Sequence, residues 1–178
     1  MSDKQKNLEA LKLAIQTEQE GKEFYSEAAK SAKTQLARET MESLARDEDF
    51  HILAIQKFYD TFDKDETWPD IEEVFTADQL KGEDTKTIFT SALKKSREEA
   101  LKLADDIAVY ERAFEFEKGG SDLYRRLRDE STDDNQRKFF DFLYEMEREH
   151  ADILERSLRF LRDPDRFYQD EESWMFEG

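Results

Sequence analysis

The sequence contains no cysteine, which excludes disulfides, zinc–thiolate sites and cysteine-ligated iron anywhere within its 178 residues. It has only 2 prolines and 5 glycines, so long helices are favoured over many short strands. No apolar run approaches the length of a membrane span or of a signal-peptide core. We therefore expect a helical, cytoplasmic protein that does not associate with membranes.

Positive charge is also in short supply, because 45 acidic residues outnumber 28 lysines and arginines and the net charge is −17. Nucleic-acid binding needs basic patches that neutralise phosphates, so we expect no nucleic-acid partner. Adsorption to anionic membranes is disfavoured for the same reason. The 14 phenylalanines and 6 tyrosines nevertheless supply enough apolar surface for one folded core in a chain of this length.

Histidine is rare as well, and both of the 2 histidines occupy the same motif, Glu-x-x-His. Each motif is preceded by a glutamate 30 positions upstream, and a tyrosine follows that glutamate by 7 positions. The two copies are Glu18, Tyr25, Glu48 and His51, and Glu117, Tyr124, Glu147 and His150. Every residue of the first copy lies 99 positions before its equivalent, which indicates a duplicated pair of helices.

Apolar residues recur at helical spacing along four segments, which predicts four long amphipathic helices. The first helix begins at about Leu8 and continues to about Ala32. The other three span about 36–62, about 106–130, and from a capping sequence at 131–134 to about 161. The first two are joined by a short turn at 33–35 and should form an antiparallel hairpin.

The middle of the chain differs in character from the four helical segments. Residues 63–84 are acidic and without a long period, so we expect at most one turn of helix, whereas 88–103 predicts a short extra helix. The whole of 63–104 would be the long crossover of a bundle whose second and third helices run parallel. We predict an all-α, antiparallel four-helix bundle over 1–162, with an acidic aromatic tail at 163–178 that packs on the bundle or on a neighbour.

Each helix carries one motif glutamate inside its apolar stripe. Seven residues make nearly two helical turns, so Glu18 shares a face with Leu11 and Tyr25, whereas Glu27 points away. Lys22 falls in the same stripe, and we expect it to snorkel towards water or to pair with an acid rather than to take part in chemistry.

Residues three apart on a helix can offer a carboxylate and an imidazole to one metal ion. Four carboxylates and two imidazoles without sulfur suit iron or manganese, and four negative charges balance two divalent ions. Without metal, some of these glutamates would have to take up protons in an apolar core. A lone Glu-x-x-His in so acidic a chain is usually a surface pair, but two matched copies that use every histidine favour a metal site. For Tyr25 and Tyr124 two interpretations stay open, a core tyrosine or a hydrogen-bond donor to a ligating carboxylate.

The segments Ala14 to Tyr25 and Ala113 to Tyr124, with the two Glu-x-x-His helices, resemble the ferritin-like di-iron carboxylate superfamily. Within it they are most similar to the rubrerythrin branch, over about 5–62 and 105–162. The resemblance implies a ferritin-like bundle, two iron ions per chain, and redox chemistry with hydrogen peroxide or dioxygen. The ligand roles that it implies are bridging or chelating for Glu48 and Glu147, terminal for Glu18 and Glu117, and one imidazole per iron for His51 and His150.

Two departures from the rubrerythrin pattern bear on function. Rubrerythrins commonly append a cysteine-ligated rubredoxin domain, so here the resemblance implies electrons from a separate, rubredoxin-like donor protein. The branch also tends to carry an extra glutamate one turn after the third-helix ligand, and three residues after Glu117 this chain has Gly120.

Three functions are compatible with these observations. The first is a di-iron oxidoreductase, a non-haem peroxidase or oxidase. The second is an iron-handling protein that oxidises Fe(II) and stores it, and the third is a metal-free helical adaptor that docks a partner through its tail. Long amphipathic helices and the aromatic tail lead us to expect a homodimer.

Overall fold

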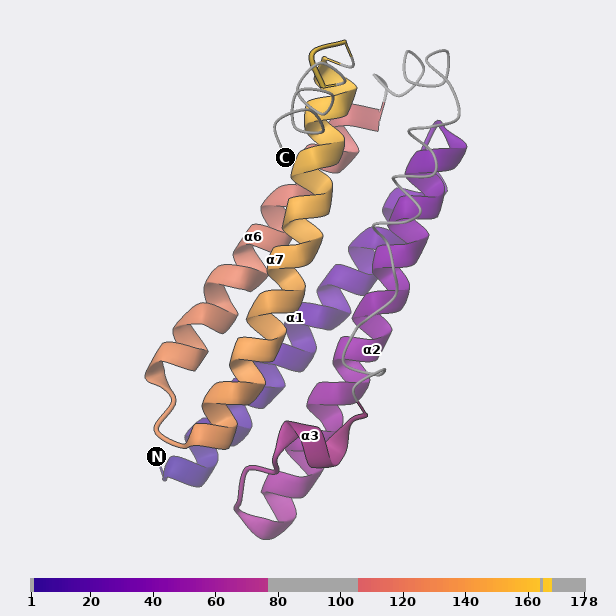
Figure 1. Ribbon diagram of the computed structural model, residues 1–178. Helices are drawn as coiled ribbons and strands as arrows, with labels where there is room; N and C mark the ends of the chain where they lie inside the picture. Colours follow the sequence, from indigo (N-terminus) through magenta and orange to yellow (C-terminus); the bar gives the residue numbers. More distant parts are fainter. Residues whose placement is uncertain (1, 77–105, 164, 168–178) are drawn as a thin grey trace.

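The computed structural model describes residues 2–76, 106–163 and 165–167. Within these ranges all regular secondary structure is helical, and no strand occurs. The helices are α1 (Asp3–Ser31), α2 (Gln35–Asp65), α3 (Ile71–Val74), α6 (Ile107–Glu130) and α7 (Asp134–Arg162). The prediction of an all-α bundle is confirmed, and Figure 1 shows α1 beside α2 and α6 beside α7 as two hairpins.

The first helix begins earlier than its apolar pattern predicted, because a capping box precedes it. The Ser2 side chain accepts a hydrogen bond from the Gln5 backbone N–H, and the Gln5 side chain accepts one from the Ser2 backbone N–H. The predicted turns also carry the expected caps. Thr34 accepts from the Ala37 N–H at the start of α2, and Asp133 accepts from two backbone N–H groups at the start of α7.

Asp106, just before α6, ties the two hairpins together at one end of the bundle. Its carboxylate accepts hydrogen bonds from the backbone N–H groups of Lys33 (2.9 Å) and Thr34 (3.0 Å) and from the Thr34 hydroxyl (2.7 Å). The Asp106 side chain is buried, although the turn that it contacts is only partly buried. The turn between α1 and α2 is thereby fixed to the start of α6.

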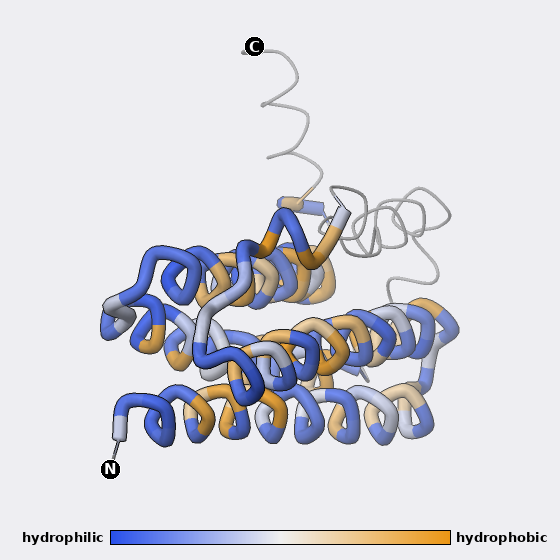
Figure 2. The backbone as a smooth tube through the Cα atoms, turned by 90° about the horizontal axis from the view of Figure 1, so that it is seen from below, coloured by the Kyte–Doolittle hydropathy of each residue, from blue (hydrophilic) through white to orange (hydrophobic). Residues whose placement is uncertain are grey.

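The apolar core is divided into two clusters along the bundle. On α1 one cluster contains Tyr25 and the alanines after it, and the other contains Leu11 and Ala14. Glu18 lies between them in the sequence, and the same division occurs on α2, α6 and α7 around the remaining motif residues. Figure 2 shows that hydrophobic and hydrophilic residues alternate within each turn of the long helices, as expected of amphipathic helices. The fold thus places one polar layer between two apolar ones.

The crossover begins later than predicted, because α2 continues to Asp65 and ends where Glu66 adopts a left-handed conformation (φ 56°). Trp68 then packs against Phe62 and Phe140, and α3 is a single turn, which fits the prediction of at most one turn of helix as far as the described residues reach. Residues 77–105, with the helix predicted at 88–103, lie outside the described residues.

Two further expectations concern the bundle surface. Phe167, the last described residue of the predicted tail, is buried against Phe160, with ring centroids 5.5 Å apart, and 168–178 lie outside the described residues. Lys22 forms the expected ion pair, with Asp49 at 2.6 Å, but its side chain is 43% exposed. Its predicted place in the buried stripe is wrong, because the buried position at this level of α1 belongs to Gly21. No helix in the described ranges has the length and apolar character needed to cross a bilayer.

Candidate metal centre

The six predicted metal ligands come together in the polar layer between the two apolar clusters. Each is at most 4% exposed, although all six are ionisable. We call this set the carboxylate–histidine layer: Glu18 on α1, Glu48 and His51 on α2, Glu117 on α6, and Glu147 and His150 on α7. Every long helix therefore contributes, and the helical period explains why, since each ligand occupies a core-facing position.

Potential ligand atoms of this layer form two overlapping groups, each with all atoms within 4.8 Å of one another. The first group is Glu18, Glu48, His51 and Glu147, and the second is Glu48, Glu117, Glu147 and His150. Glu48 and Glu147 belong to both groups. They therefore lie between two potential metal positions, as residues that bridge a pair of ions must.

The two histidines face these groups through the same ring atom. The Nδ1 atom of His51 lies 2.9 Å from Glu18 Oε2, 3.1 Å from Glu48 Oε2 and 3.4 Å from Glu147 Oε1. The Nδ1 atom of His150 lies 3.6 Å from Glu117 Oε1. The two rings stack with centroids 5.5 Å apart, so the duplicated motifs face each other across the layer.

The two motif tyrosines are buried and donate hydrogen bonds to carboxylates of the layer. Tyr25 donates to Glu117 Oε1, and Tyr124 donates to Glu18 Oε1. Of the two interpretations left open by the sequence, the structure therefore places both tyrosines beside potential ligands. Burial and the nearby carboxylates raise the pKa of both phenols well above 10, so they remain donors at any neutral pH.

Gly21 and Gly120, also 99 positions apart, make room for the two shared glutamates. A methyl group at Gly120 would lie 3.0 Å from Glu147 Oε2, and one at Gly21 would lie 2.8 Å from Phe116 Cε1 and 3.2 Å from Glu48 Oε1. Gly21 was not predicted from the sequence, although the 99-residue offset could have identified it.

Asp47 was not predicted as a site residue either. It is buried, and its Oδ2 atom lies 3.3 Å from His150 Nε2.

The four carboxyl groups of the layer differ in the direction in which their pKa is shifted. Burial raises the pKa of Glu48 and Glu147 well above the usual range, and the carboxylates of Glu18 and Glu117 raise it further. Burial alone would also raise the pKa of Glu18, but hydrogen bonds with Glu48 and a nearby imidazole lower it to about 2. Burial would likewise raise the pKa of Glu117, but the hydrogen bond with Glu147 and the nearby imidazolium lower it. This agrees with the expectation that some glutamates take up protons without metal.

The imidazoles are charged in the metal-free layer. Burial lowers the pKa of His51, but the carboxylates around its Nδ1 atom raise it well above 6.5 overall. Burial acts in the same way on His150, and Glu117 and Asp47 outweigh it, so the pKa of His150 is about 9. The directions of these pKa shifts favour neutral carboxyl groups at Glu48 and Glu147, carboxylates at Glu18 and Glu117, and two imidazolium rings, a set whose charges sum to zero. Two divalent ions with four carboxylates and neutral imidazoles would also sum to zero.

Several buried polar atoms of the layer have no hydrogen-bond partner, although leaving such an atom unsatisfied costs about 1–3 kcal/mol. They are Glu48 Oε1, His51 Nε2, Glu117 Oε2, Glu147 Oε1 and His150 Nδ1. Apart from His51 Nε2, each of these atoms could bind a metal ion, and the ion would then be its missing partner. The donor set, its overlap at two glutamates and these orphaned atoms fit a pair of divalent ions.

A model of the rubrerythrin family matches residues 9–158, which cover most of both hairpins and include all six residues of the layer. The chain belongs to the rubrerythrin family. The resemblance inferred from the motifs is thereby confirmed, and with it the ferritin-like bundle. No match was found among curated proteins or among solved structures.

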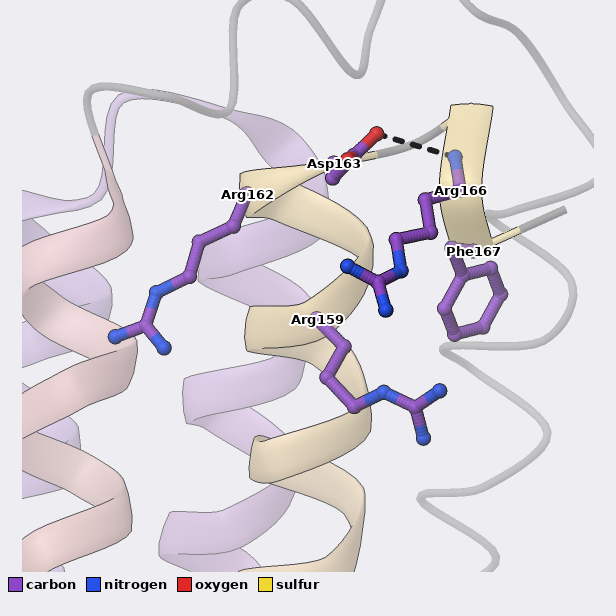
Figure 3. A pocket seen from close by; sticks show the side chains of 5 residues that line it. All are labelled: Arg159, Arg162, Asp163, Arg166 and Phe167. Atoms are coloured by element: carbon purple, nitrogen blue, oxygen red, sulfur yellow. Dashed lines mark hydrogen bonds between the residues drawn. The ribbon is translucent and has the colours of Figure 1, made fainter. Parts of the chain in front are cut away.

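One hollow of this rubrerythrin-family bundle lies away from the layer, at the end of α7 (Figure 3). It has a volume of about 290 Å³ and is lined by Arg159, Arg162, Asp163, Arg166 and Phe167. Arg159 is nine residues beyond His150, which is about 13 Å along a helix. The residues that line this hollow therefore do not reach the carboxylate–histidine layer.

Proposed function

We propose that this rubrerythrin-family chain holds two iron ions in its carboxylate–histidine layer and reduces hydrogen peroxide, or dioxygen, with electrons from a separate donor protein. The observation that carries the proposal is the pair of four-residue groups that share Glu48 and Glu147. Manganese suits the same oxygen and nitrogen ligands. Family membership supports di-iron chemistry but leaves the oxidant and the donor as parts of the proposal.

In this proposal the ligands are divided between two ions. Glu48 and Glu147 would be shared by the two ions, and the other ligands would form one set per ion, Glu18 with His51 and Glu117 with His150. When bound, two ferrous ions supply one electron each and act as Lewis acids toward the oxygen atoms of peroxide.

The chain itself orients and shields these ligands. Tyr25 and Tyr124 hold the two terminal carboxylates through their phenol hydrogen bonds, which fixes the rotamers of Glu117 and Glu18. The two apolar clusters keep bulk water from the layer on both sides along the bundle. A dry, preorganised site of this kind strengthens the electrostatic interactions within it.

Metal content tests the centre before any activity is assayed. Protein loaded anaerobically with Fe(II) should hold about two irons per chain, and a His51→Ala, His150→Ala variant should lose them. Retention of both irons by that variant, or no iron in the parent chain, would remove the basis of the proposal.

Stopped-flow oxidation of the iron-loaded protein tests the reaction. Peroxide should oxidise the parent chain much faster than a Glu48→Ala, Glu147→Ala variant. Glu149→Ala is the matched control, because Glu149 is an exposed glutamate on α7 two residues from Glu147. It should react like the parent chain, and equal rates in all three proteins would exclude peroxide reduction at this layer.

Iron handling is the second candidate, and the strongly acidic chain, with a net charge of −17, favours it because such a surface attracts cations. Size-exclusion chromatography separates the two functions. A homodimer with about two irons per chain supports the oxidoreductase, whereas a large cage with many irons per chain supports storage.

A further inference from the structure

The surroundings of the two halves of the carboxylate–histidine layer differ at a buried residue directly beside the ligands. Asp47 lies on α2 next to Glu48 and is 3% exposed, and its equivalent 99 positions later is Met146. A thioether is at best a weak hydrogen-bond acceptor, so the duplication does not preserve the chemistry at this position. The ligand set is matched between the halves, but its surroundings are not.

Asp47 contacts the side of the His150 ring that faces away from the carboxylates. Its Oδ2 atom lies 3.3 Å from His150 Nε2, whereas His150 Nδ1 faces Glu117. Asp47 belongs to neither of the two ligand groups, so it lies behind the imidazole and does not compete with it for a metal. By contrast, His51 Nε2 is buried without a hydrogen-bond partner among the described residues.

This contact determines what His150 can offer to a metal. An imidazole that donates its Nε2–H to a carboxylate carries its free lone pair on Nδ1, and its ring cannot rotate without breaking the bond. The carboxylate also increases the electron density on the ring, which strengthens a bond from Nδ1 to a cation. No described residue does the same for His51, whose orientation depends on the carboxylates around its own Nδ1 atom.

We propose that Asp47 is a positioning residue for His150, and that it makes the two metal positions of the layer inequivalent. The metal beside His150 depends on Asp47, and the metal beside His51 does not. This inference rests on the proposed two-metal centre, and it adds a dependence that the symmetric ligand set does not contain.

The test is an anaerobic Fe(II) titration of the full chain and of Asp47→Asn, with Mössbauer spectra of the loaded proteins. Loss of an outer partner of a metal ligand typically lowers affinity about 10- to 100-fold. In Asp47→Asn we expect this decrease in affinity for one iron per chain and no change for the other. At low iron concentration, the Mössbauer spectrum should lack one of its two components. The matched control is Asp49→Asn, the same change on the same helix, because Asp49 is 53% exposed and pairs with Lys22. It should titrate like the parent chain.

A double-mutant cycle identifies which iron is affected. In a His150→Ala background, Asp47→Asn should cause no further loss, because the residue that it positions is gone. In a His51→Ala background, Asp47→Asn should still weaken the remaining iron by about the same factor as in the parent chain. A purely structural role would not distinguish between the two backgrounds.

The outcomes separate this inference from the centre on which it rests. If Asp47→Asn binds both irons as the parent chain does, or weakens both equally, the inference is overturned and the centre stands. If the parent chain binds no iron, the centre itself fails. Circular dichroism of the metal-free proteins checks folding. Should Asp47→Asn not fold, Asp47→Glu takes its place, because it keeps the charge but moves the acceptor oxygen, and the same one-iron loss is expected.

Discussion

The phenol of Tyr25 on α1 donates its hydrogen bond to Glu117 on α6, not to Glu18 on its own helix. Tyr124 on α6 makes the reciprocal bond, to Glu18. Each hairpin therefore holds a carboxylate of the other hairpin. Because both bonds are buried and join ionised acceptors, they link assembly of the bundle to the geometry of the layer.

Removal of the Tyr25 hydroxyl should destabilise the metal-free protein. In Tyr25→Phe the buried carboxylate of Glu117 loses a donor, which should lower the free energy of unfolding by about 1–3 kcal/mol in urea denaturation. Tyr110→Phe is the matched control, because Tyr110 is equally buried but donates to the neutral Thr40 hydroxyl at 3.2 Å. It should lose only about 1 kcal/mol. Equal losses in the two variants would show that the bond to the carboxylate is no stronger than a neutral one.

Much of the layer could be predicted because its residues obey two regular patterns. Helical periodicity separates Glu18, which is buried, from Glu27, which is exposed, and the 99-residue offset then identifies Glu117 as its equivalent. Both patterns depend only on positions within one helix or on a repeat of the chain. Both patterns can therefore be recognised without knowledge of how the helices pack.

What could not be predicted depends on contacts between helices. Asp47 is one of 45 acidic residues and breaks the repeat, so nothing in the sequence distinguishes it until His150 is placed beside it. The hydrogen bond from Tyr25 to Glu117 could not be predicted for the same reason. Periodicity shows which face of a helix is buried, but not which helix packs against that face. Lys22 was misplaced because one turn of α1 presents both it and Gly21 near the stripe, and packing decides which is buried.

Gly120 and Gly119 offer a matched pair of substitutions on α6. A methyl group at Gly119 would meet nothing within 4 Å, so Gly119→Ala should stabilise the helix by about 1 kcal/mol. A methyl group at Gly120 would lie 3.0 Å from Glu147 Oε2 and 3.3 Å from its Cδ atom, so Gly120→Ala must displace that carboxylate by a few tenths of an ångström. Iron affinity should fall in Gly120→Ala and remain unchanged in Gly119→Ala, as measured by anaerobic titration. Equal affinities would mean that Glu147 moves without consequence for the metals.

Asp106 should be important for stability but not for metal binding. Asp106→Ala leaves the backbone N–H groups of Lys33 and Thr34 without their acceptor in a half-buried turn, which should cost about 2–3 kcal/mol in the free energy of unfolding. Asp122→Ala is the control, because its 59% exposed carboxylate pairs with Arg125 on the same helix and its loss should change stability by less than about 0.5 kcal/mol. If Asp106→Ala also lost iron, the end of the bundle and the layer would be coupled more closely than their separation suggests.

As pH rises, the stability of the metal-free protein should fall, whereas the stabilisation that iron provides should increase. A group whose pKa is raised by folding stabilises the protein below its unfolded pKa, and this contribution is lost as pH rises through the folded pKa. For His150 that window runs from 6.5 to about 9, and the raised pKa of His51 acts in the same direction. The metal-free chain should therefore lose on the order of 3 kcal/mol from His150 across this window.

Metal binding reverses the trend because ligands must lose their protons before they bind. Iron should thus release protons from both imidazoles and from Glu48 and Glu147, whose pKa values are raised, and its affinity should increase with pH up to about 9. Urea denaturation at pH 6.5 and pH 9, with and without anaerobic iron, measures both effects. The stabilisation by iron should be larger at the higher pH. Metal-free stability that stays constant over this interval would mean that the imidazoles are neutral in the folded chain, and the charge balance derived for the layer would be wrong.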